Sequence, residues 1–340
     1  MEASVANEPP ASPHGPGRWW TALAIAIGLA LLGIFIATSD LEQVGACFRL
    51  LGWTAPLVLV PEALVLTLDT WGWRSLMPAA MRARIPLPSL YLIRMAGEAL
   101  NGIMPAATVG GEPVKAHLLR AFGVPGSEAM ASVVLARTAL VASQAIFVAA
   151  GSVVLVAYLG HPRLALCWLV VQAGLVAAFV LAMVRLQQRG LAVAAWRVLG
   201  RLAPRSHLVA RLGDAAATID RRLDEFHRFE RPTFVRATAW HLLGWAGGTC
   251  EVAFMMWMID APVPLVEAFV IESLAQPIRA AAIVIPGALG VQEWGGMWLT
   301  TMLGVAEPQA VTLWLLKRAR ETVFDLVGLG YLAKRTYPGR

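Results

Sequence analysis

Long apolar segments are the feature that most restricts how this chain can fold. The stretch from Trp19 to Thr38, WWTALAIAIGLALLGIFIAT, contains no charged residue, and about 20 such residues form a helix that crosses the ~30 Å hydrocarbon core of a bilayer. Charged residues make up only 15% of the 340-residue chain, against roughly 25% in soluble domains. Because a helix satisfies its own backbone hydrogen bonds in lipid, we predict an all-α integral membrane protein.

Six segments have the length and composition of a full span: residues of about 19–38, 54–70, 129–158, 162–186, 233–259 and 306–332. Two others, 86–122 and 262–304, are apolar but contain Pro, Gly and charged residues. Non-helical backbone at membrane depth is tolerated only where protein buries it or a water-filled cavity lines it. We therefore predict that each of these two segments forms a re-entrant helical hairpin, which enters and leaves the membrane on the same side.

The distribution of arginine predicts the orientation. Arginine recurs throughout residues 185–236, and basic residues concentrate in the cytoplasmic segments of membrane proteins. This rule places both termini in the cytoplasm, and the 39–52 loop and the turn at 160–163 on the outside. We expect the protein in the cytoplasmic (inner) membrane of a bacterium. The net charge of +6 then reflects orientation, and we expect no nucleic-acid partner.

The chain divides into a disordered cytoplasmic tail over 1–18, a first membrane half over 19–186, a cytoplasmic amphipathic segment over 187–232, a second membrane half over 233–333 and a cytoplasmic tail over 334–340. The first tail is Pro-rich and polar, which is typical of disorder. In the amphipathic segment the residues on one helical face are apolar: Leu208, Leu212, Ala215, Ile219, Leu223 and Phe226. This face either lies on anionic lipid headgroups or caps the helical bundle.

An internal repeat relates the two broken segments. Residues 105–137, PAATVGGEPVKAHLLRAFGVPGSEAMASVVLAR, align without a gap with residues 286–318, PGALGVQEWGGMWLTTMLGVAEPQAVTLWLLKR. Pro, Glu, Gly and Arg all recur at an offset of 181 residues, which chance matches between apolar segments do not explain. Three spans separate the hairpins, so the first opens to the cytoplasm and the second to the outside. This predicts an inverted-topology repeat, which lets one central site face either side.

Charged residues in the membrane halves are the candidate binding residues. We expect Glu112 and Glu293 at the start of a hairpin's second arm, where the helix N-terminus favours a carboxylate. They are either helix-start residues only or part of a site, and the insertion cost of roughly 2.5–3.5 kcal/mol per charge favours a site. We expect the charges to meet in a positive cavity at mid-depth. The predicted substrate-binding residues are Arg94, Glu98, Asn101, Glu112, Lys115, Arg137, Arg279, Glu293, Arg318 and Glu321.

The charges around Arg318 have two interpretations. Glu321 lies at the right helical spacing to pair with Lys317 and with Arg318, so the group either neutralises itself and locks the bundle, or leaves positive charge to hold an anionic headgroup. The guanidinium fork matches a phosphate group, which supports the second interpretation. Glu62 and Asp69 are weaker candidates for the same polar site.

Signatures of other chemistry are missing from the sequence. Cys47, Cys167 and Cys250 lie far apart, and the histidines show no metal-ligand spacing. The chain contains no Walker-type glycine loop and no arrangement of nucleophile and base. We therefore expect no metal, no cofactor and no enzymatic reaction, with a membrane transferase as the less favoured alternative.

Two motifs carry a family resemblance. LNGIMPAATVGGEPVKAHLL at 100–119 and PGALGVQE at 286–293 resemble conserved elements of the flippase-like transmembrane family. That family is named for the membrane part of lysylphosphatidylglycerol synthase, the bacterial multiple peptide resistance factor, and includes a hopanoid-associated membrane protein. The resemblance covers about residues 19–332. Trp294 and the glycines that follow it depart from the pattern, so the substrate is not identified by it.

The resemblance implies a lipid translocator built from two inverted halves with re-entrant helices. It points to Asn101, Glu112, Lys115 and Glu293 as site residues. It also implies structural hinge or break positions, namely Pro105, Gly110, Gly111, Pro286, Gly287 and Gly290. No aminoacyltransferase domain follows Arg340, so we do not expect lipid lysylation.

The function that these observations favour is a flippase-like translocator in the cytoplasmic membrane. It would move a phospholipid or a lipid-linked glycan or isoprenoid by alternating access, with the headgroup held by Arg137, Arg318 and Lys115. Glu112 and Glu293 would balance these charges or carry protons. The alternatives are a secondary transporter of a small anionic solute and a non-transporting scaffold in lipid biosynthesis. A homo-oligomer and a lipid-synthesis enzyme are the protein partners considered.

Overall fold

The computed structural model describes residues 17–103, 110–202, 207–282 and 284–336. Within these ranges every regular element is a helix, so the all-α prediction is confirmed. The predicted break at Pro105 and most of the tail over 1–18 lie outside the described residues. In chain order the helices are α1 (Gly17–Thr38), α2 (Leu41–Leu51), η1 (Gly52–Val58), α3 (Leu59–Ser75), α4 (Ala79–Arg84), α5 (Leu87–Ile103), α6 (Gly111–Leu119), η2 (Arg120–Phe122), α7 (Gly126–Tyr158), α8 (Pro162–Gln188), α9 (Leu191–Leu202), α10 (His207–Phe229), α11 (Arg231–Met258), α12 (Leu265–Ala281), η3 (Pro286–Ala288), α13 (Val291–Met302) and α14 (Glu307–Thr336).

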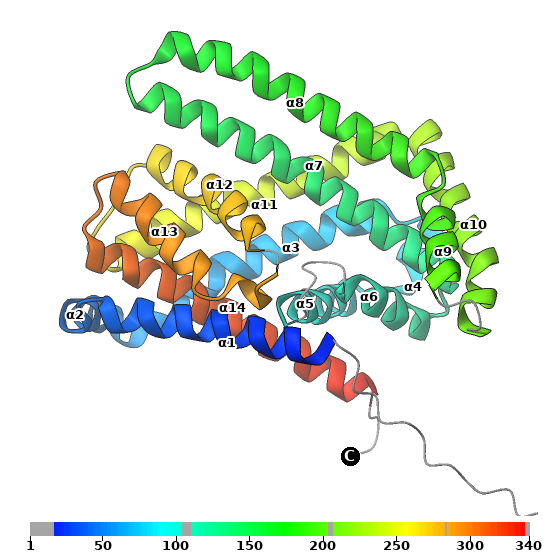
Figure 1. Cartoon of the computed structure of the whole chain (residues 1–340), viewed down its shortest axis with the longest axis horizontal. Helices are drawn as coiled ribbons and strands as arrows, with labels where there is room; N and C mark the ends of the chain where they lie inside the picture. The colour runs from blue at the N-terminus through cyan, green and yellow to red at the C-terminus, as the bar shows by residue number, and fades with distance from the viewer. Residues whose placement is uncertain (1–16, 104–109, 203–206, 283, 337–340) are drawn as a thin grey trace, which may run out of the picture.

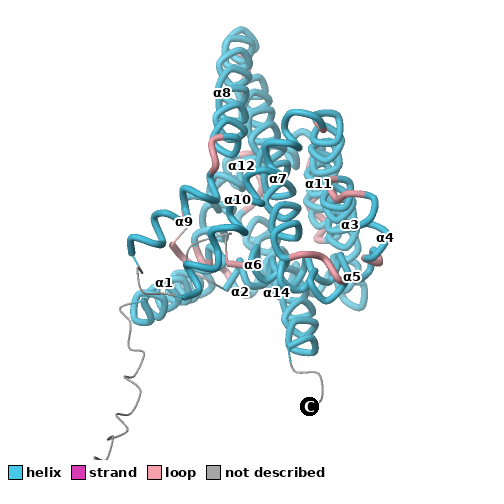
Figure 2. Tube along the Cα trace, turned by 90° about the vertical axis from the view of Figure 1, so that its right-hand side faces the viewer, coloured by secondary structure: helices cyan, strands magenta, loops and turns pink. Residues whose placement is uncertain are grey.

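The long helices lie side by side in one bundle. Figure 1 shows α1 along one edge, α7 and α8 along the opposite edge, and α9 and α10 gathered at one end. In the view of Figure 2, α8 projects beyond the other helices. Three apolar cores hold the described bundle together, and the smallest consists of Phe35, Val44 and Val311. The first contains Trp73, Leu119 and Leu223, and the second contains Met255 and Trp314.

Three helical segments among the described residues are long and apolar enough to cross a membrane: Leu41–Ser75, Gly126–Tyr158 and Pro162–Gln188. Ala22–Thr38 is a shorter apolar helix. The other predicted spans correspond to α11 and α14. Helix α14 is continuous, but near its middle the apolar sequence gives way to a run of charged residues that includes Lys317 and Arg318. The structure thus contains several membrane-compatible helices, and the count of six spans stays a prediction.

The segment over 39–52 differs from the sequence prediction, because most of it is not a loop but helix α2. Asp40 caps this helix, with its Oδ1 accepting a hydrogen bond of 3.1 Å from the backbone N–H of Gln43. Val44, Cys47 and Leu51 recur every three or four residues and are buried. This amphipathic spacing is that of a helix packed on one face, and α2 packs against α14.

The amphipathic segment over 187–232 forms two helices that pack on each other and on the bundle. Asp220 of α10 caps α9, because its carboxylate accepts hydrogen bonds of 2.8 Å from the backbone N–H groups of Ala192 and Val193. Leu223 and Phe226 are buried in the first core. The described part of the apolar face of α10 therefore packs on protein, as expected if this face caps the bundle, and a contact of the segment with lipid headgroups stays a prediction.

Both broken segments form two helical arms that pack together, α5 on α6 and α12 on α13. In the first, a Cβ at Gly111 would lie 1.9 Å from the carbonyl oxygen of Gly97, so only glycine allows the arms to approach this closely. In the second, Gly287 and Gly290 have φ angles of 60° and 77°, which favour glycine. A Cβ at Gly290 would also lie 2.3 Å from that of Leu31, so the break is packed against α1.

Candidate functional site

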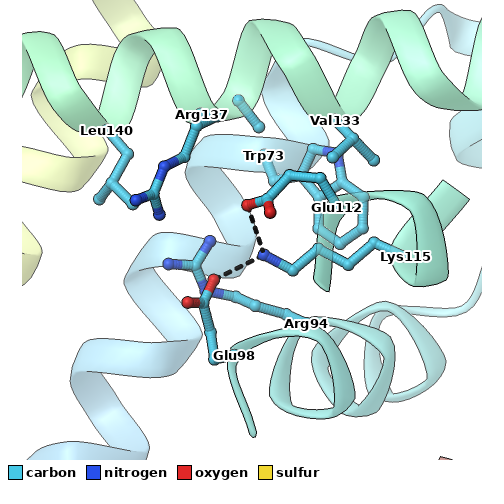
Figure 3. Close-up of a pocket in the computed structure, with 9 residues that line it drawn as sticks. Trp73, Arg94, Glu98, Glu112, Lys115, Val133, Arg137 and Leu140 are labelled. Carbon is cyan, nitrogen blue, oxygen red and sulfur yellow. Dashed lines mark hydrogen bonds and ion pairs between the residues drawn. The ribbon is translucent and has the colours of Figure 1, made fainter. Parts of the chain in front are cut away.

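The first polar cluster consists of Arg94, Glu98, Asn101, Glu112, Lys115 and Arg137. Lys115 lies at its centre, with its Nζ 2.6 Å from Oε1 of Glu98 and 3.6 Å from Oε1 of Glu112 (Figure 3). The Lys115 and Glu112 side chains are only 7% and 9% exposed. Two helices of the same broken segment therefore bring a cation and two carboxylates together inside the protein.

Asn101 joins the two arms of this segment. Its Oδ1 accepts a hydrogen bond of 2.7 Å from the backbone N–H of Gly111, the first residue of α6. Its Nδ2 donates to Glu98 and to Glu112, each at 3.4 Å. One side chain thus satisfies a free N–H at the start of α6 and fixes both carboxylates around Lys115.

Arg94 is held from the other side by a buried acid. Its Nη2 lies 2.8 Å from Oδ2 of Asp69 on α3, and the other oxygen of Asp69 lies 2.6 Å from Nδ1 of His241 on α11. His241 has no exposed surface. Sequence reasoning ranked Asp69 as a weak candidate and assigned no role to His241, because the two lie far apart in the chain and only the packing of α3 on α11 joins them.

Arg137 differs from the other cations of the first cluster. Figure 3 shows its side chain pointing from α7 into the space occupied by Arg94 and Glu98. Among the described residues, no carboxylate lies within ion-pairing distance of its guanidinium. The cavity that Arg137 lines has a volume of about 10 Å³, which is room for about one water molecule. Arg94, Lys115 and Arg137 face it together with Glu98 and Glu112. Because Arg94 also pairs with Asp69, the three cations are matched by three carboxylates, and Arg137 is the cation without a direct ion pair among the described residues.

The second polar cluster consists of Arg279, Gln292, Glu293, Arg318 and Glu321. Arg318 of α14 lies at its centre. Its Nε is 2.6 Å from Oε1 of Glu293 and its Nη1 is 3.1 Å from Oε2 of Glu321. Its Nη2 also donates to the carbonyl oxygen of Gly287 at 3.0 Å. One guanidinium therefore holds both the start of α13 and the non-helical break before it.

Glu293 is fully buried and does two things. Its Oε2 accepts a hydrogen bond of 2.7 Å from the backbone N–H of Gly290, which caps α13, while its Oε1 binds Arg318. The contact with Gly290 agrees with the interpretation of Glu293 as a helix-start residue, and the contact with Arg318 makes it one half of an ion pair, while its role in a binding site stays a prediction. Arg279 and Gln292 bind Glu321, at 3.0 Å and 3.3 Å.

A third group, the buried network, joins α14 to three other helices. Lys317 pairs with Glu272 at 2.7 Å, and Arg320 pairs with Glu251 at 2.6 Å and also with Glu62. Lys317 therefore does not pair with Glu321, as the helical spacing predicted, while the predicted pair of Glu321 with Arg318 is present. The network matches the interpretation in which charges of α14 lock the bundle.

The ten predicted binding residues thus fall into two clusters, one in each half of the chain. The structure does not show them lining one large chamber, since the cavity at the first cluster is lined by no residue of the second. The clusters approach each other where the second break meets α5: a Cβ at Gly287 would lie 3.3 Å from the carbonyl oxygen of Gly102, and one at Gly102 would lie 3.5 Å from Oδ2 of Asp325.

Several members of the polar groups were missed or underrated in the sequence: Asp69, His241, Glu251, Glu272, Lys317 and Arg320. Glu251 is a lone carboxylate in an apolar helix, which is by itself a signal of a buried partner. Glu62 and Asp69 are seven residues apart, and hence on one face of α3. Among the described residues, no group of three or more His, Cys, Asp or Glu side chains is arranged to hold a metal ion.

Comparison with known proteins identifies a family for this chain. A family model described as the lysylphosphatidylglycerol synthase TM region matches residues 19–328. No curated protein and no solved structure gives a match. The matched residues include both broken segments and both polar clusters. The chain therefore belongs to the family of lysylphosphatidylglycerol synthase transmembrane regions, and is a multi-pass membrane protein of a lipid-related family.

Proposed function

We propose that this protein is a translocator that moves a phospholipid or a lipid-linked glycan or isoprenoid across the cytoplasmic membrane. The observation that carries the proposal is the guanidinium of Arg137, which faces a cavity lined by charged side chains and has no carboxylate within ion-pairing distance among the described residues. A cation inside a membrane protein is costly unless an anion compensates it. A phosphate-bearing headgroup supplies that anion in a geometry matched to the guanidinium fork.

The topology we propose consists of six spans and two re-entrant hairpins related by an inverted repeat. Its support is the equivalence of the two broken segments. Each has a first arm, a break, and a second arm that begins within two residues of a buried glutamate, Glu112 in α6 and Glu293 in α13. Each is followed by a long helix with an arginine at the repeated position, Arg137 in α7 and Arg318 in α14.

The two halves differ in one contact, and this difference suggests how access alternates. Arg318 binds Glu293 at 2.6 Å, whereas Arg137 binds no carboxylate of the described residues and Glu112 lies 3.6 Å from Lys115. We assign this arrangement to one of two end states. In the other state the equivalent pair of Arg137 and Glu112 forms while Arg318 releases Glu293. A headgroup bound by the free arginine is then passed from one half to the other as the repeats exchange conformations.

The protein takes no covalent part in this process, and its residues bind, orient and compensate charge. Lys115 and Arg137 attract the headgroup, and Glu98 keeps Lys115 in place through the 2.6 Å contact. Arg94 is kept at the cavity by Asp69 at 2.8 Å, so its guanidinium stays in the cavity wall.

A lipid-exchange assay tests the proposal. The purified full chain is reconstituted in liposomes with fluorescent anionic, zwitterionic or polyprenyl-phosphate lipids, and inner-to-outer exchange is measured. We expect protein-dependent exchange of at least one of these phosphate-bearing lipids. Arg137→Ala should slow it about tenfold or more, since a hydrogen bond to a charged group contributes about 1.5–3 kcal/mol.

The control is Arg228→Ala, because Arg228 lies in α10, its side chain is 63% exposed and its partner is Asp224. This variant should exchange lipid at the wild-type rate. Wild-type protein that moves none of the lipids defeats the proposal. Equal exchange by the wild-type protein and Arg137→Ala defeats the headgroup role of Arg137.

A further inference from the structure

A groove between α7, α8 and α12 lies apart from the charged clusters. Its volume is about 340 Å³, within the range of about 300–1,000 Å³ that is usual for small-ligand sites. Most of its wall is apolar, including Val148, Leu175 and Phe179. Alanines on α7 and α12 leave the space open, among them Ala149.

The groove opens toward the hydrocarbon of the membrane. Its outer wall is α8, one of the three helices long and apolar enough to span, and this helix projects from the bundle (Figure 2). Large apolar side chains on α8 are exposed, with Leu166 at 65% and Val170 at 69%. Such a surface is stable when lipid chains cover it, so lipid is the medium at the mouth of the groove.

Three glutamines make one part of this apolar groove polar. Gln144 lies near the middle of α7 and donates to Oε1 of Gln276 at 3.3 Å. Gln172 of α8 donates to Ser152 at 3.1 Å. Within the described part of the chain, the Oε1 atoms of Gln144 and Gln172 accept no hydrogen bond. Amides facing hydrocarbon need partners, so these two oxygens are available to a ligand.

The glutamines also connect the groove to the buried network. Gln276 donates to the carboxylate of Glu272 at 3.2 Å, and Glu272 pairs with Lys317 at 2.7 Å. Gln276 directly precedes Pro277, a proline inside α12. A ligand in the groove therefore contacts the first arm of the second broken segment, which is an element of the proposed transport machinery.

We propose that this groove binds a diacyl membrane lipid, with an acyl chain along its apolar wall and the glycerol-ester region at the three glutamines. Amide N–H groups donate to ester carbonyl oxygens, and the free amide oxygens accept from hydroxyl or amine groups of the lipid. A second protein helix is about 10 Å across and needs a wider groove than an acyl chain does. An acyl chain is narrow enough to enter.

This inference rests on the membrane placement and adds to the proposed function a location for the apolar part of the lipid. It requires binding and not transport. A photolabelling experiment tests it with the full chain in lipid nanodiscs that contain phosphatidylglycerol with a diazirine in one acyl chain. After irradiation, labelled residues are located by mass spectrometry. We expect more labelling at residues 141–149 and 172–179 than on the outward face of α8.

Two matched substitutions sharpen the result. Ala149→Phe fills the groove and should abolish the excess labelling there, whereas Ala177→Phe, at an exposed position on α8 outside the groove, should leave it unchanged. Gln144→Leu should reduce it about threefold, since a hydrogen bond within a membrane protein contributes about 0.6 kcal/mol on average. Thermal unfolding tests whether each variant is folded. Gln172→Leu is used in place of any variant that fails this test.

Labelling that is equal in the groove and on the outward face of α8, and unchanged by Ala149→Phe, overturns the inference. So does a cross-link between two protein chains in place of the lipid label. Groove labelling together with no lipid exchange in liposomes supports the binding site and counts against the transport function alone. Lipid exchange without groove labelling supports the transport function and overturns the binding site.

Discussion

The substitution Glu293→Gln tests how much the second break depends on one carboxylate. Glu293 is fully buried and binds Arg318 at 2.6 Å with one oxygen and the Gly290 N–H at 2.7 Å with the other. Glutamine has nearly the same shape but one acceptor oxygen and no charge, so it can keep only one of the two bonds. The variant therefore leaves either the helix start or the guanidinium without its partner.

The size of the effect follows from burial. Removal of one partner of a buried ion pair costs about 3–5 kcal/mol. Glu321 remains 3.1 Å from Arg318, so we expect the lower end, about 3 kcal/mol. With about 2–4 °C of Tm per kcal/mol in larger domains, the Tm should fall by about 6–12 °C. Tryptophan fluorescence during thermal unfolding of the detergent-solubilised protein measures this shift.

Glu112→Gln is the matched control from the other half of the repeat. Lys115 keeps Glu98 at 2.6 Å in this variant, so its Tm should fall much less, by an amount equivalent to about 1 kcal/mol. Equal losses in the two variants, or no loss in Glu293→Gln, would refute the assignment of Glu293 as the dominant contact of the second break.

Three further predictions concern other elements. Gly290→Ala should destabilise the protein, because the added Cβ would lie 2.3 Å from Leu31 of α1 and the residue has a φ of 77°. The control Gly33→Ala adds a Cβ that meets no atom within 4 Å, so it should be neutral or stabilising by up to ~1 kcal/mol. Equal Tm values for the two variants would contradict this. Asn101→Ala removes the hydrogen bond to the Gly111 N–H and should cost about 0.5–2 kcal/mol, visible as faster hydrogen exchange in α6 but not in α13. Burial lowers the pKa of His227, so the folded state favours the neutral imidazole. The free energy of unfolding therefore keeps its full value above about pH 6.5 and falls as the pH drops below that value. The Tm of His227→Gln should then fall less between pH 7.5 and pH 5.5 than that of the wild-type protein, and an equal fall would contradict the assignment.

The candidate site was partly predictable because its residues break local rules. Four of them are charges in apolar surroundings: Glu112, Glu293, Arg137 and Arg318. Because inserting a charge into a membrane is costly, a charge at such a position indicates a partner or a function. Asn101 was found by its motif, and the structure gives it a physical function as the cap of α6. The glutamines of the α7–α8–α12 groove were not identified as a set, because no spacing in the sequence brings Gln144, Gln172 and Gln276 together.

Ion-pair partners were the least predictable feature. Helical spacing favoured Lys317 with Glu321, but Lys317 binds Glu272, 45 residues away. A long charged side chain in a helix reaches partners on several packed neighbours. Which of them it meets depends on how the helices cross, and the spacing along one helix holds no information about that.

The sequence by itself determined that the chain is helical and membrane-compatible, and that the second broken segment is interrupted at Gly287 and Gly290. Apolar length, Pro and Gly positions and the 181-residue repeat are local or internal properties, so they can be read without any packing. Only the tertiary structure decided that the charges form two clusters and a separate network, and that a groove of about 340 Å³ lies beside α8. It also decided that, among the described residues, Arg137 lacks the carboxylate partner that its equivalent Arg318 has. The physical reason is that ion pairs and cavities are formed between helices, and their geometry depends on distances that the chain order does not contain.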